Sequence, residues 1–299
     1  MPNEKKDSDN MNSLKTNNTL HDFFQDIQNF DKLNIKEIEP TTKNINEYVF
    51  EGDLNIIIDE LINLILKEMN EGKSKELIKK HVLSYIGNKM ITFKQLYNWL
   101  LNNQCTSNSI YLFGYINYHG IGTNSNEQKA FELCQKAAEL ENIVAQIDIT
   151  NMHIYGKSGD NNYNLAFKLS KKLAEECASG MKNLGYCYEK GIGTDINEQK
   201  AFELYQKSAD LGNSIGIKNL GQCYYEGIGT DTDKQKAFEL YQKAANLGND
   251  TAQYNIAIMY EYGNGVKKDI NQAIYWYKKS AEQEYQCAKI KLKKLLVEF

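Results

Sequence analysis

The C-terminal two thirds of the sequence repeat a short pattern every 36 residues. The string GIGT begins at Gly120, Gly191 and Gly227, and the related string GNGV begins at Gly263. A degenerate copy begins at Gly156, which gives five copies. A period of this length is typical of arrays in which each unit is one supersecondary element that cannot bury its apolar face alone. The repeat therefore predicts a linear stack of similar units.

Each copy predicts two helices joined by a tight turn. In the third copy, Met181, Leu184 and Tyr188 share one helical face. Gly191 follows, where a left-handed backbone can end that helix. An Asn or Asp then precedes a repeated alanine by four residues in every copy, as expected for the N-cap of a second helix. These N-cap candidates are Asn126, Asn162, Asn197, Asp233 and Asp269.

Small residues recur inside the predicted helices. Gly114, Gly185 and Gly221 fall in the middle of first helices. A glycine there costs about 1 kcal/mol relative to alanine. The recurrence of this cost predicts that a partner helix approaches closely at each of these positions.

These residues together resemble a known family. Each copy resembles the Sel1-like repeat, a relative of the tetratricopeptide repeat. The motifs that carry the resemblance follow one another as LG, a tyrosine, G-x-G-[TV], an Asn or Asp cap and K-A-x-x-x-Y-x-K-[AS]-A. Residues 183–213 and 219–249 match this pattern closely, and the resemblance extends over about 109–299. It implies an all-α, right-handed α-solenoid of about five Sel1-like helical hairpins. It also implies an adaptor that gathers other proteins.

The sequence divides into three regions. Residues 1–34 are rich in Asn, Asp and Lys and predict a disordered tail. Residues 35–108 predict a helical N-terminal lead-in, with Ser74 and the Thr92–Gln95 capping box starting its later helices. Residues 109–299 predict the repeat solenoid, ending in a Lys-rich capping helix that begins near Tyr285. The lead-in also resembles a linker that accompanies Sel1-like repeats in fungal kinase-associated families.

Composition argues against several classes of function. The 35 basic residues, all of them lysines, and the 39 acidic residues give a net charge of −4, without the basic excess typical of nucleic-acid binding. The chain lacks a long apolar stretch, so we expect no membrane insertion. The polar N-terminus and six cysteines without metal-ligand spacing favour a cytoplasmic protein with reduced thiols.

Motifs for chemistry are weak, and we expect neither catalysis nor a cofactor or metal. Kinase motifs are absent from the sequence. Ser179 and Lys182 match the start of a serine-hydrolase pattern, but its companion motifs are missing. A repeat-based hydrolase therefore stays an unfavoured alternative. A broad screen for hydrolase activity that Ser179→Ala abolishes would test it.

Two positions of the first helices are candidates for partner binding, because we expect them to face a concave groove. Such a mixture of tyrosine, amide, acid and apolar groups suits the capture of a protein or peptide. The first position comprises Tyr115, Asn151, Tyr186, Gln222 and Ile258, and the second comprises Tyr118, Ile154, Glu189, Tyr225 and Glu261.

The sequence therefore favours an adaptor or scaffold that binds other proteins on the concave face of the solenoid. One alternative is a non-catalytic regulatory member of a kinase-linked signalling family, binding its partner through the N-terminal third. Another is a structural array that binds nothing tightly. A protein kinase or signalling complex is among the candidate partners, whereas nucleic acid is not.

Overall fold

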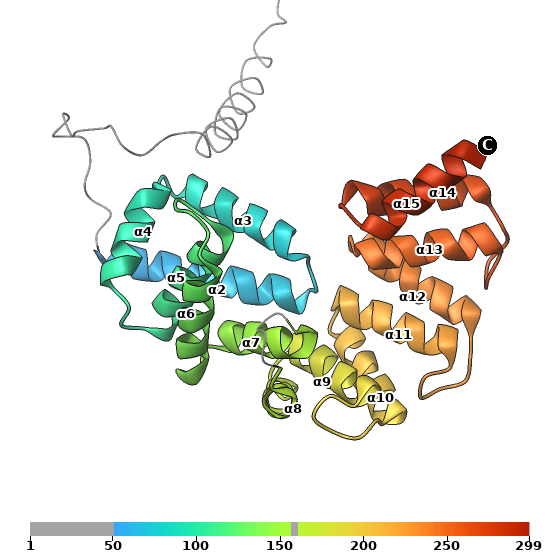
Figure 1. Ribbon diagram of the computed structural model, residues 1–299, viewed down its shortest axis with the longest axis horizontal. Helices are drawn as coiled ribbons and strands as arrows, with labels where there is room; N and C mark the ends of the chain where they lie inside the picture. Colours follow the sequence, from blue (N-terminus) through green and yellow to red (C-terminus); the bar gives the residue numbers. More distant parts are fainter. Residues whose placement is uncertain (1–50, 157–160, 299) are drawn as a thin grey trace, which may run out of the picture. The chain divides into compact units, whose positions relative to one another are not determined.

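The computed structural model describes residues 51–156 and 161–298, and every regular element in them is an α-helix (Figure 1). The prediction of an all-α solenoid is confirmed. The predicted disordered tail over 1–34 and the first part of the lead-in lie outside the described residues.

The helices fall into a lead-in and a series of hairpins. The lead-in comprises α2 (Glu51–Asn70), α3 (Lys75–Asn88) and α4 (Phe93–Asn102). The first helices of the repeats are α5 (Ser107–His119), α7 (Ile143–Tyr155), α9 (Ala178–Lys190), α11 (Ser214–Glu226) and α13 (Asp250–Tyr262). The second helices are α6 (Glu127–Glu139), α8 (Tyr163–Leu173), α10 (Glu198–Asp210), α12 (Lys234–Asn246) and α14 (Ile270–Glu282). Helix α15 (Gln286–Glu298) follows α14.

The predicted caps define these helices. Asn126 accepts a hydrogen bond from the Lys129 amide at the start of α6, and the cap residues of the other second helices do the same. Ser74 caps α3, and Thr92 forms the predicted capping box with Gln95 on α4. A left-handed glycine ends each first helix from α5 to α13. Local sequence therefore fixes where each helix begins or ends.

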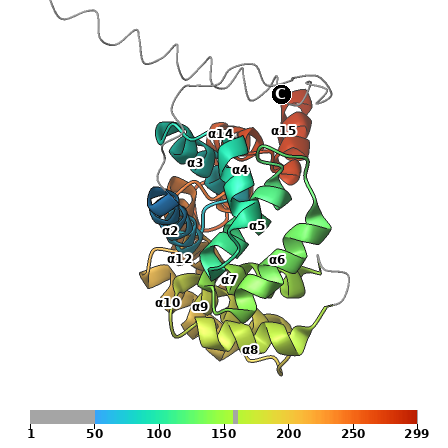
Figure 2. The same cartoon turned by 90° about the vertical axis from the view of Figure 1, so that its left-hand side faces the viewer.

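Each first helix packs against its own second helix and against neighbouring repeats. Figure 1 shows α11, α13 and α15 following one another toward the C-terminus, and Figure 2 shows α8 beside α7 and α9. The predicted close approach occurs at Gly185, where an added Cβ would lie 2.9 Å from the Tyr205 ring. The glycine is therefore needed to bring α9 against α10.

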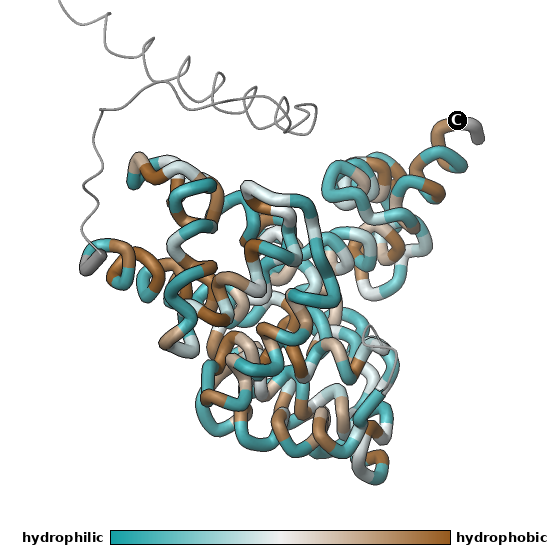
Figure 3. Tube along the Cα trace, turned by 60° about the vertical axis from the view of Figure 1, so that its left-hand side comes forward, coloured by the Kyte–Doolittle hydropathy of each residue, from teal (hydrophilic) through white to brown (hydrophobic). Residues whose placement is uncertain are grey.

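Aromatic rings join successive repeats in a constant geometry. Tyr188 packs edge-on against Phe167 of the preceding repeat, with ring centroids 5.5 Å apart. The same contact joins Tyr224 to Phe202 and Tyr260 to Phe238, each at 5.4 Å. Apolar and polar segments alternate along the helices in Figure 3, as this packing requires. These tyrosines are half-buried and pack against the hydrophobic core of the C-terminal repeats.

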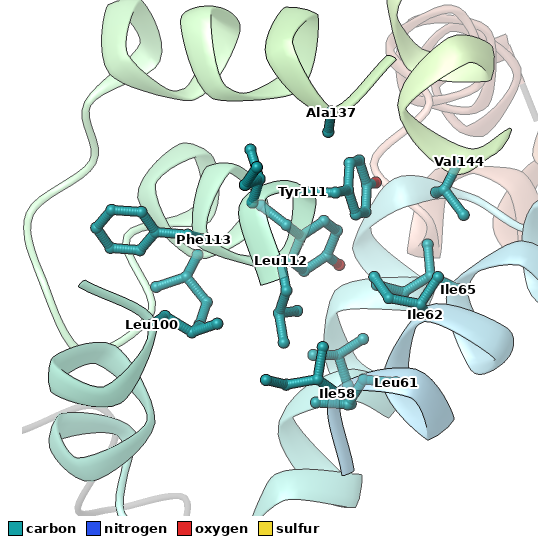
Figure 4. Packing of buried hydrophobic residues seen from close by; sticks show 14 of the residues in the cluster. Ile58, Leu61, Ile62, Ile65, Leu100, Tyr111, Leu112, Phe113, Ala137 and Val144 are labelled. Atoms are coloured by element: carbon teal, nitrogen blue, oxygen red, sulfur yellow. The ribbon is translucent and has the colours of Figure 1, made fainter. Parts of the chain in front are cut away.

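The lead-in and the first repeats share one hydrophobic core. Figure 4 shows Leu112 of α5 between Ile58 and Leu61 of α2 on one side and Leu100 of α4 on the other. The same cluster continues into the second repeat at Ile149. The predicted boundary between residues 108 and 109 therefore separates two sequence patterns, but the apolar side chains on its two sides form one core.

Candidate functional site

Helix α2 packs across the first helices α5, α7 and α9. We call the side of the stack that it contacts the first-helix face. Partner binding is expected on these same first helices. The lead-in therefore covers part of the surface on which partner binding was predicted.

The C-terminal turn of α2 is hydrogen-bonded to the start of α9. The Ser179 amide donates to the Asn70 side-chain oxygen at 3.2 Å. The Ser179 hydroxyl donates to the Met69 carbonyl at 2.7 Å. Ser179 is 3% exposed, so both bonds are shielded from water.

The start of α11 holds the next residues of the same turn. The Asn213 side-chain amide donates to the Asn70 carbonyl at 2.9 Å. The Ser214 amide donates to the Glu71 carbonyl at 3.0 Å, and its hydroxyl donates to the Gly72 carbonyl at 2.8 Å. An added Cβ on Gly72 would lie 2.9 Å from the Ser214 nitrogen, so glycine is required at this contact.

Elementary electrostatics explains this arrangement. The last carbonyls of a helix lack partners within the helix and carry its partial negative charge, whereas the first amides of a helix carry partial positive charge. The starts of α9 and α11 therefore satisfy the carbonyl end of α2. We call residues Met69–Gly72 the α2 tip.

Beside the α2 tip, the first-helix face contains a cavity of about 1030 Å³. Met69 and Ile78 of the lead-in form one side. Tyr118, Met152 and Lys182 are among the residues that the repeats contribute. The cavity is thus composite, because both the lead-in and the repeats line it, and it is open to solvent.

Lys182 is the deepest cation of this cavity. Lys182 is only 6% exposed, and its Nζ donates to the Oδ1 of the neighbouring Asn183 at 2.5 Å. Burial, followed by the nearby charge of Lys218, lowers the pKa of Lys182 to about 8. No carboxylate among the described residues forms an ion pair with Lys182. Burial also lowers the pKa of Lys218.

A second, smaller cavity of about 40 Å³ lies against α5. Its wall contains Asp148, which accepts hydrogen bonds from Tyr111 at 2.9 Å and Lys75 at 3.4 Å. Burial lowers the pKa of His119 to about 4 and raises the pKa of the Cys134 thiol well above its ordinary value. Both shifts favour neutral side chains, and a neutral thiol is a poor nucleophile.

The structure distributes the first set of candidate residues over different environments. Tyr115 is 8% exposed, and its hydroxyl has no hydrogen-bond partner. Asn151 lines the larger cavity. Tyr186 lies 5.6 Å from the Tyr155 ring, and Gln222 donates to Glu226 of its own helix. Ile258 packs partly buried beside Tyr277.

The second set is more strongly engaged within the protein. Tyr118 lines the larger cavity, whereas Ile154 is 6% exposed in a cluster with Ala166 and Cys187. Glu189 accepts from the Tyr205 hydroxyl at 2.6 Å. Glu261 accepts from Tyr277 at 2.5 Å, and the Tyr225 hydroxyl accepts from Asn264 at 3.1 Å. Only Tyr118 and Asn151 of the ten candidates line the larger cavity.

The candidate set did not include the starts of α9 and α11. The sequence signal at α11 is the asparagine that also precedes α7 and α13, at Asn142, Asn213 and Asn249, whereas α9 is preceded by Cys177. Each asparagine accepts a hydrogen bond from its own helix, which hides the free side-chain N–H behind an ordinary capping role. The Asn213 side-chain N–H donates to the Asn70 carbonyl of the α2 tip, which is 143 residues away in the sequence, so local sequence does not indicate this contact.

The part of the chain that the structure describes gives no support to two other classes of site. No group of three or more His, Cys, Asp or Glu residues there could hold a metal ion. No helix among the described residues is long and apolar enough to cross a membrane. All six cysteines are free, and Cys105 and Cys287 are exposed.

The hairpins and their caps define the class as a helical repeat protein. The Sel1 repeat model matches residues 107–142, 144–176, 178–213, 215–249 and 250–285, and the chain belongs to the Sel1 repeat family. Proteins of this family are generally protein–protein interaction modules and are typically non-catalytic.

Solved structures support the same assignment. A Sel1 repeat protein from Oxalobacter formigenes shares 25% identity and a TM-score of 0.55, over 79% of this chain and 86% of that chain. The protective antigen c5321 of uropathogenic Escherichia coli, which displays an SLR fold, shares 22% identity and a TM-score of 0.53. The latter match covers 82% of this chain and 49% of that chain, and at this identity it shows the fold alone.

Proposed function

We propose that this chain is an adaptor that binds other proteins on its first-helix face. The observation that supports this function is the match of five Sel1 repeats, because proteins of this family are generally protein–protein interaction modules. The capture of the α2 tip by α9 and α11 shows the kind of contact that these helices make. Ser179, Asn213 and Ser214 bind main-chain carbonyls of a segment more than 100 residues away in the sequence. A surface that holds its own chain through main-chain contacts offers the chemistry needed to hold a partner segment.

The α2 tip occupies the starts of α9 and α11, so a partner would use the rest of this face. The C-terminal part carries Gln222, Tyr225 and Ile258, all half-buried. Such residues present side-chain area without being part of a closed core. We place the main partner contact there, on α11 and α13.

Point variants of the full chain test this function better than truncation, because the core crosses residue 108. The variants Tyr225→Ala and Gln222→Ala would be compared with Tyr275→Ala, which removes a 49% exposed tyrosine from a second helix. Proteins retained from a lysate would be quantified by mass spectrometry. We expect a discrete partner to be lost with Tyr225→Ala and retained with Tyr275→Ala.

The alternative, in which the N-terminal third holds a kinase-linked signalling partner, has its own variant. Ile56 of α2 is 58% exposed, so Ile56→Lys alters the surface of the lead-in without changing its core. Loss of the partner with Ile56→Lys alone would favour this alternative and contradict the proposed contact on α11 and α13. The cytoplasmic location stays a prediction, which fractionation of cells would test.

A further inference from the structure

We propose that the 1030 Å³ cavity binds a small amphipathic carboxylic acid, with Lys182 holding the carboxylate and the apolar wall holding the body of the ligand. This binding function is separate from the capture of protein partners. It rests on the position of Lys182, on the walls of the cavity and on the position of the α2 tip.

The first observation is an uncompensated buried cation. An ammonium group has three N–H donors, and the structure gives Lys182 one acceptor, the neutral Asn183 oxygen. A buried charge without a counter-charge is costly, and a charged hydrogen-bond partner offsets that cost. The depressed pKa of Lys182 reflects the same burial. An anion in the cavity would supply the missing charge and further acceptors.

Unpartnered amide atoms accompany Lys182. The Asn183 Nδ2 is buried without a hydrogen-bond partner, and Asn183 itself is 0% exposed. The Asn151 side-chain oxygen is also buried and unpartnered, and Asn151 lines the cavity. Asn183 is not among the residues that line the cavity, so its amide holds Lys182 and does not contact a ligand. The Asn151 oxygen is an acceptor, so it calls for a hydrogen-bond donor on the body of the ligand and not for the carboxylate itself.

The charges around Lys182 favour a single negative charge. Lys75 is already paired with Asp148, and Lys73 is already paired with Glu68 and Glu71. The sequence contains no arginine that could clamp a phosphate. Of the three lysines that line the cavity, Lys182 alone has no ion pair with a described residue, and the exposed Glu127 also lines the cavity. Lys218, whose charge acts on Lys182, is not among the lining residues. A singly charged carboxylate therefore matches these charges better than a phosphate dianion.

The remaining wall determines the body of the ligand. Apolar side chains line the cavity, among them Met69, Ile78, Phe131, Ile147 and Met152. The volume of about 1030 Å³ lies just above the range of about 300–1,000 Å³ that is usual for small-molecule sites, so a compact acid would fill only the part beside Lys182. The α2 tip fills the neighbouring starts of α9 and α11, which prevents an extended peptide from continuing along the face. A compact acid with an aliphatic or aromatic body fits these walls.

The test uses the full chain with methionine methyl groups labelled for NMR, because Met69 and Met152 line the cavity. The probes are octanoate and 4-phenylbutyrate, each compared with its neutral amide. We expect saturable shifts of these two methyl signals and about tenfold tighter binding of each acid than of its amide. Lys182→Leu should abolish this preference, whereas Lys207→Leu, on the exposed side of α10, should retain it.

Folding of Lys182→Leu is checked by circular dichroism, and Asn151→Asp provides a second variant. The new carboxylate of Asn151→Asp would repel an acid and weaken its binding about tenfold, with little effect on the amide. Equal binding of acid and amide, or an acid preference that survives Lys182→Leu, would overturn the proposal.

A tetrapeptide with a free C-terminus and its amidated form complete the test. Binding of only the free-acid peptide, lost with Lys182→Leu, would overturn the small-molecule proposal and assign the carboxylate to a protein partner. The adaptor function is tested separately by Tyr225→Ala, because Tyr225 is not among the residues that line the cavity. Failure of one proposal therefore leaves the other intact.

Discussion

The hydroxyl of Tyr205 donates a 2.6 Å hydrogen bond to the carboxylate of Glu189 across the α9–α10 hairpin. Two repeats later, Tyr277 makes the same bond to Glu261 at 2.5 Å. Burial raises the pKa of Tyr205 well above its ordinary value, so the phenol stays a donor at neutral pH. The second set of candidate residues thus contains acids whose side chains also bind the hairpin together.

Tyr205→Phe tests this contribution to stability. It leaves the partly buried Glu189 carboxylate without its phenol donor, so we expect a loss of about 1–2 kcal/mol in the free energy of unfolding. Tyr275→Phe, at a 49% exposed tyrosine, should change the same quantity by less than about 0.5 kcal/mol. Urea denaturation followed by circular dichroism measures both. Equal effects would mean that the bond adds nothing to stability.

Gly229→Ala tests the packing between repeats. Gly229 has a φ of +64°, and an added Cβ would lie 2.3 Å from the Glu198 carbonyl oxygen. Gly212 also has a positive φ, +82°, but nothing lies within 4 Å of its added Cβ. We expect Gly212→Ala to cost about 1 kcal/mol from backbone strain alone, and Gly229→Ala to cost at least about 2 kcal/mol. Thermal unfolding of both variants provides the comparison.

Asn213→Asp tests the capture of the α2 tip. Aspartate can still cap α11, but it loses the N–H that reaches the Asn70 carbonyl and sets a negative charge against carbonyl oxygens. We expect a loss of about 1–3 kcal/mol and faster hydrogen exchange at the Ser214 amide.

Asn197→Asp is the matched control for Asn213→Asp. The equivalent caps of α12 and α14 are already aspartates, Asp233 and Asp269. Asn197→Asp should therefore change stability by less than about 0.5 kcal/mol. If both variants lose the same stability, the effect belongs to helix capping and not to the α2 tip.

Lys182→Leu tests the pH dependence of stability. The pKa of Lys182 is about 8 in the folded protein and about 10.5 ordinarily, so between these values the unfolded chain binds more protons. Stability linked to Lys182 should therefore rise with pH from about 8 to 10.5. Below pH 8 the free-energy cost of burying the charged Lys182 side chain is fully present and amounts to about 3 kcal/mol.

The measurement is the difference in unfolding free energy between Lys182→Leu and the unaltered chain. We expect this difference to favour the variant most strongly at pH 7 and to shrink by pH 10.5. A difference that stays constant from pH 7 to 10.5 would show that Lys182 titrates normally in the folded protein.

Removal of residues 1–108 tests the shared core. Leu112 and Phe113 are 0% exposed in a cluster that includes Leu61 and Leu96 of the lead-in. Residues 109–299 alone should therefore expose apolar surface, bind a hydrophobic dye and unfold at lower temperature. A fragment as stable as the full chain would show that the repeats do not depend on the lead-in.

The repeat unit follows from local sequence signals. The 36-residue period, the caps at Asn126 and its equivalents and the glycines after each first helix are local signals, because they act through backbone geometry and hydrogen bonds within a few residues. The close approach at Gly185 was also predictable, since a costly mid-helix glycine implies a neighbour.

The position of the lead-in and the surface that it covers depend on contacts between segments far apart in the sequence. The bonds from Ser179, Asn213 and Ser214 to the α2 tip join segments more than 100 residues apart, and no periodic pattern relates those segments. The burial of Ile154 and the isolation of Lys182 likewise depend on which helices surround them. Helix boundaries follow from neighbours in sequence, whereas exposure, charge pairing and the shape of a cavity follow from neighbours in space.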